Sequence, residues 1–379
     1  MRAEGQTIMS EIAKLFTFVR LYGVGRTIAK VAGRIRPRFS LIRPFFGRRD
    51  IALIGCGQFG FATIGYFIGR SFGARFLWCY DPEESNRNSF ARYYRVPHNS
   101  DVAEGWNDDP RVKFVYIASN HASHSSYAIK SLEAGKIVYI EKPVSVSFQQ
   151  LRDLEFAREE SQGTIFAGYN RPHSKAVRVI RAKVGTSTSA PMTLCCYVSG
   201  HQISKDHWYR DEVEGTRICG NAGHWIDLFV NMCHWRDTLP EKFFLRLTPA
   251  IPNEPDDNFS LTITTDLGDL FTLVLSSRSE PYGGINETIN LQWGGIIAKI
   301  DDFCRMELWE PKSRRQFRFW HKDVGHKRAI MQPFSNNKQR LWGEVLRSTI
   351  LTLSVMEMVK SGETERTVDL PIELASMKR

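Results

Sequence analysis

A glycine-rich turn that follows a short apolar run is the feature that most constrains how this chain can fold. Ile51–Ile54 leads directly into Gly55-Cys56-Gly57-Gln58-Phe59-Gly60, a complete G-x-G-x-x-G. A second apolar run, Phe76–Tyr80, ends at Asp81, which lies 21 residues beyond Gly60. A buried strand, this turn, a helix and an acidic residue at this spacing predict the dinucleotide-binding unit of a Rossmann fold.

The residues of this turn have separate expected roles. Gly55 permits the tight turn, Gly57 lets the backbone approach a pyrophosphate, and Gly60 allows the helix to pack closely on the strand. The N–H groups at the start of the helix that follows would bind the phosphates, and Gln58 and Phe59 of the turn are expected to bind the cofactor as well. A glycine-rich turn that holds no ligand is the alternative interpretation.

Asp81 indicates which dinucleotide binds. Its carboxylate would accept hydrogen bonds from the adenosine ribose hydroxyls and would repel a 2′-phosphate. The next residue is Pro82, and the nearest arginine of the loop is Arg87. We therefore expect NAD as the cofactor, with NADP as the disfavoured alternative.

The order of apolar and helical segments predicts two domains of different construction. In the first, strands alternate with helices, which is typical of a parallel, doubly wound sheet. Its expected strands are 51–54, 76–80, 112–118, 138–140 and 164–167, and its expected helices are 62–70, 83–93, 123–134 and 147–160. In the second, strands are expected at 193–199, 243–248, 259–266, 269–277, 287–293, 296–300 and 305–309, and residues 337–360 return to a helical pattern.

The predicted fold class is therefore α/β. An N-terminal Rossmann domain with a doubly wound parallel sheet precedes a C-terminal α+β domain with an open, mostly antiparallel sheet. The expected boundaries are a basic amphipathic extension at 1–49, the NAD-binding domain at 50–170, a substrate-binding and oligomerisation domain at 171–345, and a C-terminal helix and tail at 346–379.

Almost all of the net charge belongs to the N-terminal extension. Residues 1–49 carry 11 Lys/Arg and 2 Asp/Glu, which is +9 of the +10 for the whole chain. Residues 8–22 and 24–36 each place apolar side chains at helical spacing with cations beside them. We expect a peripheral membrane contact through residues 8–36, or packing of the apolar stripe on the protein's own body or on a sister subunit. A secretory signal and a nucleic-acid partner are not expected.

The seven cysteines are scattered and include no C-x-x-C pair. This pattern predicts reduced thiols in a cytoplasmic protein, with the inner face of the membrane as an alternative location. The cysteines and histidines also lack the spacing of a zinc finger or of H-E-x-x-H, so no metal site is expected.

A lysine follows the expected strand at 138–140. Lys142 stands within Glu141-Lys142-Pro143. In a doubly wound sheet the carboxyl ends of the strands line the ligand crevice, so this lysine is expected to contact a polar group. A solvated surface lysine is the alternative.

Four segments together resemble the Gfo/Idh/MocA oxidoreductase family. They are Gly55–Gly60, Ala118-Ser119-Asn120-His121-Ala122-Ser123-His124, Ala134-Gly135-Lys136-Ile137-Val138-Tyr139-Ile140-Glu141-Lys142-Pro143 and Gly168-Tyr169-Asn170-Arg171-Pro172. The resemblance covers about residues 50–345 and implies the two-domain fold above, NAD(P) binding, and redox chemistry on sugars, inositols or nucleotide sugars. Residues 206–208, 214–221, 224–227, 302–303 and 323–326 are similar to the branch found with bacterial surface-polysaccharide biosynthesis.

The resemblance implies roles for a lysine and a histidine. Lys142 would reach the reacting hydroxyl, and His224, which Asp227 follows, would be the general acid/base. Oxidation of an alcohol needs a base for the hydroxyl proton and a cation for the developing alkoxide. Many members have Asp where this chain has Gly220, so the proton relay is left to His224 and Lys142. A core histidine is the alternative for His224.

The remaining site residues are expected around the cofactor and the substrate. The expected cofactor-binding residues after Asp81 are Ser119, Asn120, His121, His124, Glu141 and Lys142, with a helix cap as the alternative for His124; many family members have Pro-Asn where this chain has Asn120-His121. The expected substrate-binding residues are Tyr169, Asn170, Arg171, His207, Arg217, Asn221 and Asp227. Arg171 could bind a carboxylate or phosphate, and ordinary interdomain packing is the alternative for Tyr169, Asn170 and Arg171.

These features predict an NAD-dependent oxidoreductase that transfers hydride between nicotinamide and a sugar hydroxyl or keto group. A nucleotide sugar is the favoured substrate, and cell-surface polysaccharide biosynthesis the favoured setting. A non-catalytic NAD- and sugar-binding regulator on the same scaffold is the alternative, although only an enzyme needs both Lys142 and His224. The open sheet of the second domain also predicts a homo-oligomer.

Overall fold

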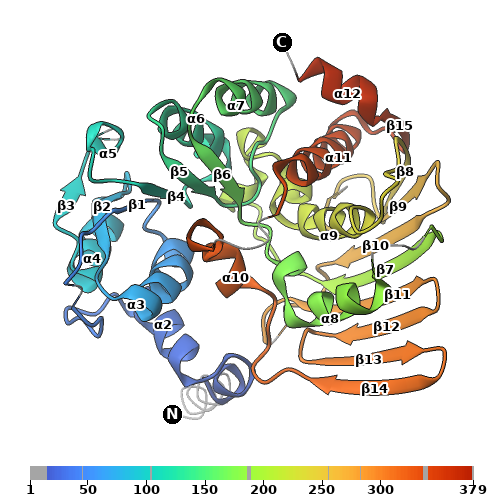
Figure 1. Cartoon of the computed structure of the whole chain (residues 1–379), viewed down its shortest axis with the longest axis horizontal. Helices are drawn as coiled ribbons and strands as arrows, with labels where there is room; N and C mark the ends of the chain where they lie inside the picture. The colour runs from blue at the N-terminus through green and yellow to red at the C-terminus, as the bar shows by residue number, and fades with distance from the viewer. Residues whose placement is uncertain are drawn as a thin grey trace.

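A computed structural model describes residues 15–44, 46–102, 105–185, 189–254, 256–281, 283–335 and 340–377. Two sheets organise these residues, with the N-terminal helices beside the first sheet and the C-terminal helices over the second (Figure 1). Within the described part of the chain, no helix has the length and apolar character that a membrane crossing requires.

The first sheet is parallel and has the order β3-β2-β1-β4-β5-β6. Its strands are β1 (Ile51–Ile54), β2 (Phe76–Tyr80), β3 (His98–Ser100), β4 (Phe114–Ile117), β5 (Ile137–Ile140) and β6 (Thr164–Ala167). Its helical segments are η1 (Gly60–Gly65), α3 (Tyr66–Phe72), α4 (Glu84–Tyr94), α5 (Gly105–Asp108), η2 (His121–Ser123), α6 (His124–Glu133) and α7 (Phe148–Glu160). Every residue of β1 and β4 is buried, because helices cover both faces of the sheet.

The second sheet is mostly antiparallel, with one parallel pair between β10 and β7. Its order is β14-β13-β12-β11-β7-β10-β9-β8-β15. The strands are β7 (Met192–Ser199), β8 (Lys242–Pro249), β9 (Phe259–Thr265), β10 (Leu270–Ser276), β11 (Asn286–Trp293), β12 (Ile296–Asp301), β13 (Arg305–Glu310), β14 (Ser313–Arg318) and β15 (Glu365–Asp369). The fold class expected from the sequence is thus confirmed.

Helices cover one face of this second sheet. These helices are α8 (Lys175–Val184), α9 (Gly223–Cys233), α11 (Trp342–Ser361) and α12 (Leu370–Ser376). Short helical segments lie in the connections, namely η3 (Arg171–His173), η4 (Trp208–Arg210), η5 (Glu212–Glu214) and η6 (Ile218–Ala222). In contrast, α10 (His326–Ile330) and η7 (Gln332–Phe334) pack on the first domain. Helix α9 is almost fully buried, and its Phe229 ring stacks on Phe271 of β10 at 5.0 Å. The opposite face keeps Tyr197, Phe244 and Ile297 about half exposed.

Most expected elements occur within a few residues of their predicted positions, and the differences are specific. The helix expected from Ala62 already begins at Gln58, directly after the glycine-rich turn. Strands β3, β14 and β15 and helix α8 were not expected from the sequence. Residues 8–14 and 337–339 of two expected helices lie outside the described residues.

The N-terminal extension is packed against the first domain, but not by its apolar stripe. Residues 15–22 are helical, and α2 (Val24–Ile35) follows them and lies beside η1 (Figure 1). Val24, Ile28, Val31 and Ile35, the expected stripe, are 38–68% exposed. The opposite side of the helix is buried instead, so the expectation that the stripe packs on the protein's own body is wrong.

Candidate functional site at the domain junction

The glycine-rich turn has the geometry that a dinucleotide needs. Gly55 has φ +92°, and a Cβ there would collide with the carbonyl group of Ala118; a Cβ at Gly60 would collide with the Gly55 carbonyl. At Gly57, by contrast, a Cβ would meet no described atom within 4 Å. Because the helix begins at Gln58, its first N–H groups lack an acceptor within the helix and can bind phosphate oxygens. These residues fit the pyrophosphate of NAD.

Asp81 fixes this turn from the end of β2. Its buried carboxylate accepts hydrogen bonds from the backbone N–H groups of Cys56 (2.7 Å) and Glu83 (2.9 Å). A carboxylate has further lone pairs, so ribose hydroxyls can still donate to it. Arg36 reaches the same corner and donates to the Cys56 carbonyl at 3.0 Å, a contact that the sequence did not predict.

Lys142 extends from the end of β5 toward the second domain. Its Nζ donates to the carbonyl oxygen of Gly220 at 2.9 Å, across 78 residues of sequence. Beneath it, Glu141 is buried and accepts a hydrogen bond from Tyr139 at 2.7 Å, and burial raises the pKa of Glu141 to about 7. The lysine is therefore held at the domain junction and is not a solvated surface side chain.

Gly220 shows why this chain lacks the carboxylate that many family members have there. A Cβ at Gly220 would lie 2.7 Å from the ring of Tyr209 and 3.1 Å from the ring of His121. These two rings occupy the volume that a longer side chain would need. Position 220 therefore has no room for a side chain unless these rings move.

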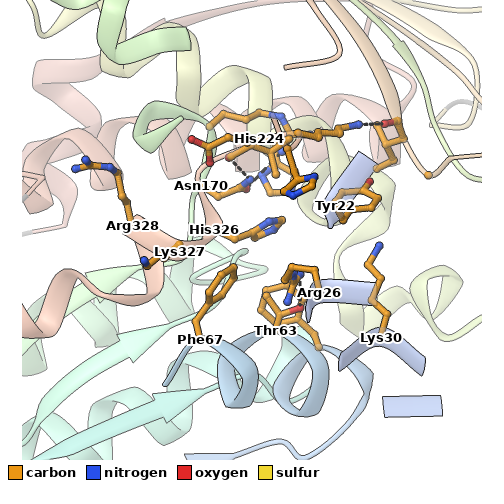
Figure 2. Close-up of a pocket in the computed structure, with 18 of the residues that line it drawn as sticks. Tyr22, Arg26, Lys30, Thr63, Phe67, Asn170, His224, His326, Lys327 and Arg328 are labelled. Atoms are coloured by element: carbon orange, nitrogen blue, oxygen red, sulfur yellow. Dashed lines mark hydrogen bonds between the residues drawn. The ribbon is translucent and has the colours of Figure 1, made fainter. Parts of the chain in front are cut away.

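His224 lies in the first turn of α9 and faces the cavity between the domains (Figure 2). Its Nδ1 is buried and has no hydrogen-bond partner among the described residues. Burial, with the nearby charges of Arg171 and Lys142, holds the pKa of His224 well below its usual range. The imidazole is thus neutral at neutral pH and has a free nitrogen.

The expected cofactor residues after β4 are engaged by a segment of the second domain. Glu214 accepts hydrogen bonds from the Asn120 amide (2.6 Å) and the Ala122 N–H (3.0 Å). The His121 Nδ1 lies 3.1 Å from the Glu214 carbonyl oxygen. Glu214 therefore closes the carboxyl end of β4 from the second-domain side.

His124 connects two loops of the first domain. Its ring nitrogens lie 2.7 Å from the Pro143 carbonyl oxygen and 3.1 Å from that of Ser119. Burial lowers the pKa of His124 to about 4, so the neutral ring donates to one of these oxygens. Its position tethers the loop that carries Lys142 to the loop after β4.

Two of the expected substrate residues line the cavity, and Tyr169 lies close by. The Asn170 amide donates to the Val324 carbonyl at 2.6 Å, and the buried Tyr169 ring lies 6.4 Å from that of His224. Arg171 lines the cavity but forms a buried, two-pronged ion pair with Glu287 at 2.8 and 3.1 Å. Its charge is thus compensated by Glu287, which favours the packing alternative over the binding of a substrate anion.

The other expected substrate residues do not line this cavity. Asp227 is buried between α9 and α11, where Arg340 and Ser348 donate to it at 2.7 and 2.8 Å. Arg217 is buried against Asp257, and Asn221 pairs with Arg217 and the Gly220 carbonyl. His207 lies outside the cavity, stacked beside Trp208. These side chains hold the second domain together.

The cavity has a volume of about 720 Å³ and receives residues that the sequence did not single out. Tyr22, Arg26 and Lys30 enter from the N-terminal extension, and His326 from α10 stands near its centre (Figure 2). His326 packs against Phe59 with ring centroids 5.8 Å apart. The motif at 323–326 could have indicated that His326 belongs to the site. The amphipathic pattern of residues 24–36, in contrast, predicted that the cations of α2 face solvent.

A family model described as "Oxidoreductase family, NAD-binding Rossmann fold" matches residues 49–169. Over 229 residues the chain is 32% identical to trans-1,2-dihydrobenzene-1,2-diol dehydrogenase of Bos taurus, across 60% of this chain and 64% of that protein. It is 26% identical over 153 residues to inositol 2-dehydrogenase of Ralstonia nicotianae, across 39% of this chain and 44% of that protein. These alignments span less than two thirds of the curated relatives.

Solved structures share the whole two-domain fold. A levoglucosan dehydrogenase in complex with NADH and levoglucosan superposes with a TM-score of 0.67 and 13% identity, over 85% of this chain and 99% of that chain. At that identity the likeness concerns the fold. Together with the glycine-rich turn, the family match identifies the first domain as an NAD-binding Rossmann domain.

Proposed function

We propose that this chain, whose residues 49–169 match the Gfo/Idh/MocA model of NAD-binding oxidoreductases, transfers hydride between NAD and a hydroxyl or keto carbon of a sugar or polyol. One observation carries the proposal. Phe59 of the dinucleotide turn and His224, with its neutral ring and free Nδ1, line the same cavity. The dinucleotide site and a proton acceptor therefore border the same cavity, as a hydride transfer coupled to a proton transfer requires.

His224 in this cavity and Lys142, which lies outside the cavity lining but whose charge acts on His224, can together perform the proton transfer that the reaction requires. Bound NAD supplies the hydride acceptor for oxidation of the alcohol. His224 accepts the hydroxyl proton, since its ring is unprotonated at neutral pH. Lys142 stabilises the oxygen as negative charge develops on it. In the reverse direction His224 returns the proton to that oxygen.

Several finer features belong to the same proposal. A nucleotide sugar as substrate, in surface-polysaccharide biosynthesis, is supported by the resemblance of residues 206–208, 214–221, 224–227, 302–303 and 323–326 to that branch. The domain boundaries near residues 50, 170 and 345, a cytoplasmic location and a homo-oligomer formed through the half-exposed face of the second sheet stay predictions. A membrane contact through residues 8–36 also stays a prediction. The direction of Arg26 and Lys30 disfavours it, because both side chains enter the cavity.

A substrate panel tests the proposal. The full-length protein is incubated with NAD and, separately, with polyols, neutral sugars, uronic acids and nucleotide sugars, and NADH absorbance is followed. We expect NADH to form with at least one compound. NAD binding without turnover of any compound, in either direction, would favour a non-catalytic regulator instead.

A further inference from the structure

The cavity that holds His224 is strongly cationic. Among the described residues that line it, seven are lysine or arginine and two are carboxylates. Two of the cations have buried or partly buried partners: Arg171 pairs with Glu287, and Lys322 pairs with Asp302 at 2.6 Å. The excess positive charge therefore comes from other side chains, and two of these belong to the N-terminal extension.

Lys30 has no carboxylate partner among the described residues. Its ammonium instead lies over two aromatic faces, 4.5 Å from the Phe18 centroid and 4.1 Å from the Tyr22 centroid. Burial, with the repulsion of Arg26, Lys322 and Arg34, lowers the pKa of Lys30 to about 7. An ammonium in this position is costly without a counter-charge.

Arg26 is held at the edge of the same cavity by neutral groups. Its guanidinium donates to the Ala62 carbonyl and to the Thr63 hydroxyl at 3.4 Å, and it lies 4.8 Å from the Phe67 ring centroid. These contacts orient the charge without compensating it. Burial lowers the pKa of Arg26 to about 10.

Contacts on two sides of α2 fix the helix in the orientation that directs Arg26 and Lys30 into the cavity. Gly33 packs against Ala62 and the Gln58 side chain, and the Gln58 amide donates to the Lys30 carbonyl at 3.2 Å. On the other side, the Tyr22 hydroxyl donates to the Gly283 carbonyl at 3.2 Å. The helix thus leaves its apolar stripe exposed and turns two of its cations, Arg26 and Lys30, into the cavity, the reverse of what hydrophobic burial favours.

We infer that α2 forms a wall of the substrate cavity and that Arg26 and Lys30 bind an anionic group of the substrate, either a phosphate or a carboxylate. The inference rests on the proposed function and adds the charge class of the sugar derivative. A bound anion would supply the counter-charge that both side chains lack. It would also raise the pKa of His224 toward the range in which a general base works best.

The cofactor's own pyrophosphate is the competing anion, so the test uses protein already saturated with NADH. Thermal unfolding of the full-length protein is followed with glucose, glucuronate, glucosyl phosphate and UDP-glucose. A ligand that binds the folded state raises the melting temperature according to its affinity. We expect at least one anionic probe to raise the melting temperature and glucose to leave it unchanged. A response to glucuronate would indicate a carboxylate site, and a response to glucosyl phosphate or UDP-glucose would indicate a phosphate site.

Variants locate the anion site. Lys30→Gln and Arg26→Gln should each lower the affinity for the anionic probe by roughly 10-fold or more, because a charged partner of the anion is lost. The affinity for NADH should stay within about 2-fold of that of the unmodified protein. Lys30→Gln removes no described hydrogen bond of the Lys30 side chain, so it is the variant least expected to impair folding. Arg34→Gln is the matched control, because it removes the same charge from an exposed position of the same helix.

The outcomes separate this inference from the proposed function. If no anionic probe stabilises the NADH-loaded protein, or if Lys30→Gln and Arg34→Gln behave alike, the inference is wrong while the oxidoreductase proposal stands. If Lys30→Gln lowers the affinity for NADH, Lys30 binds the phosphates of the cofactor, and the inference that it binds the substrate is wrong. If NADH does not bind to the unmodified protein, the proposed function fails first.

Discussion

His224 has a buried neutral ring and a nitrogen without a partner among the described residues. His173 and His234 share both properties, but of the three only His224 lines the cavity between the domains. Core histidines are normally satisfied by hydrogen bonds, because a buried polar atom without one is costly. Here Nδ1 has no such partner among the described residues, and the His224 side chain lines a cavity that Phe59 of the dinucleotide turn also lines. We propose that Nδ1 has no partner because it accepts the proton of the substrate. The sequence motif alone could not distinguish this catalytic role of His224 from a role in the core.

Removing either of the two groups that act on the reacting oxygen should lower turnover without abolishing cofactor binding. We expect His224→Ala and Lys142→Ala each to lower kcat by roughly 10²–10⁴, the usual contribution of a general acid or base. NADH affinity, measured by fluorescence titration, should change little, since neither side chain contacts the glycine-rich turn. His98→Ala, a histidine outside the cavity, is the control. Full activity of His224→Ala would assign the base elsewhere.

Asp81 should determine the choice between the two nicotinamide cofactors. Its carboxylate at the end of β2 would repel a 2′-phosphate, so the protein should bind NADH more tightly than NADPH. Asp81→Asn removes the charge but keeps an oxygen for the Cys56 N–H, and it should narrow the difference. Parallel fluorescence titrations measure both affinities. Tighter binding of NADPH by the unmodified protein would show that Arg36, at the same corner, dominates instead.

The depressed pKa of Lys30 gives anion binding a pH dependence with a defined sign. With a pKa of about 7, Lys30 is cationic below this pH and neutral above it. The affinity for an anionic ligand should therefore fall as pH rises from 6 to 8.5, approximate limits that bracket this pKa. The pKa of Arg26 is lowered only to about 10, and the pKa values of Lys322 and of the Tyr22 phenol are raised, so these neighbours keep their charge states over this range. Lys30→Arg should flatten the profile, and an unchanged profile in that variant would contradict the role of Lys30.

At the scale of elements, the first domain could be predicted from sequence far better than the site. Strands such as β1 and β4 are buried on both faces and therefore appear as uninterrupted apolar runs. Strand β14 escapes the same reasoning because nearly all of its side chains are exposed at the sheet edge, so no alternation marks it. Strand β15 is likewise an edge strand.

The direction of α2 could not be predicted because periodicity gives the faces of a helix but not their neighbours. The apolar stripe suggested a buried face, whereas the structure buries Thr27, Ala29, Ala32 and Gly33. The small residues allow close approach to η1, and this packing decides which cations enter the cavity. The contact depends on residues more than 20 positions away, and a local pattern does not contain that information.

Deleting residues 1–36 should therefore impair the protein rather than leave its two domains intact. The deletion removes the hydrogen bonds from Arg26 and Arg36 to the turn region and the contact of Tyr22 with the second domain. We expect the melting temperature to fall by about 4 °C or more, which corresponds to roughly 1–2 kcal/mol for a larger domain. Calorimetry of the shortened and full-length chains measures it. Equal melting temperatures would mean that the extension is energetically separate.

At the scale of the whole molecule, the site exists only because three parts of the chain meet. The first domain supplies the dinucleotide turn and Lys142, the second supplies His224 and His326, and the N-terminal extension supplies Arg26 and Lys30. Figure 1 shows the extension running from α3 toward the left end of β14, beside the connection that leads to α10. The backbone N–H of Lys322 donates to the Leu21 carbonyl at 2.8 Å, which links this crossing to the second domain. A sequence read segment by segment identifies the parts but not their meeting point.

Direct hydride transfer in this cavity is the central claim, and an isotope label tests it most directly. The substrate that emerges from the panel is prepared with deuterium on the carbinol carbon and is oxidised with NAD by the full-length protein. The nicotinamide of the product is then examined by mass spectrometry. The account predicts that each reduced nicotinamide carries one deuterium from the substrate. Reduced nicotinamide without deuterium, with the label lost to water, would contradict it.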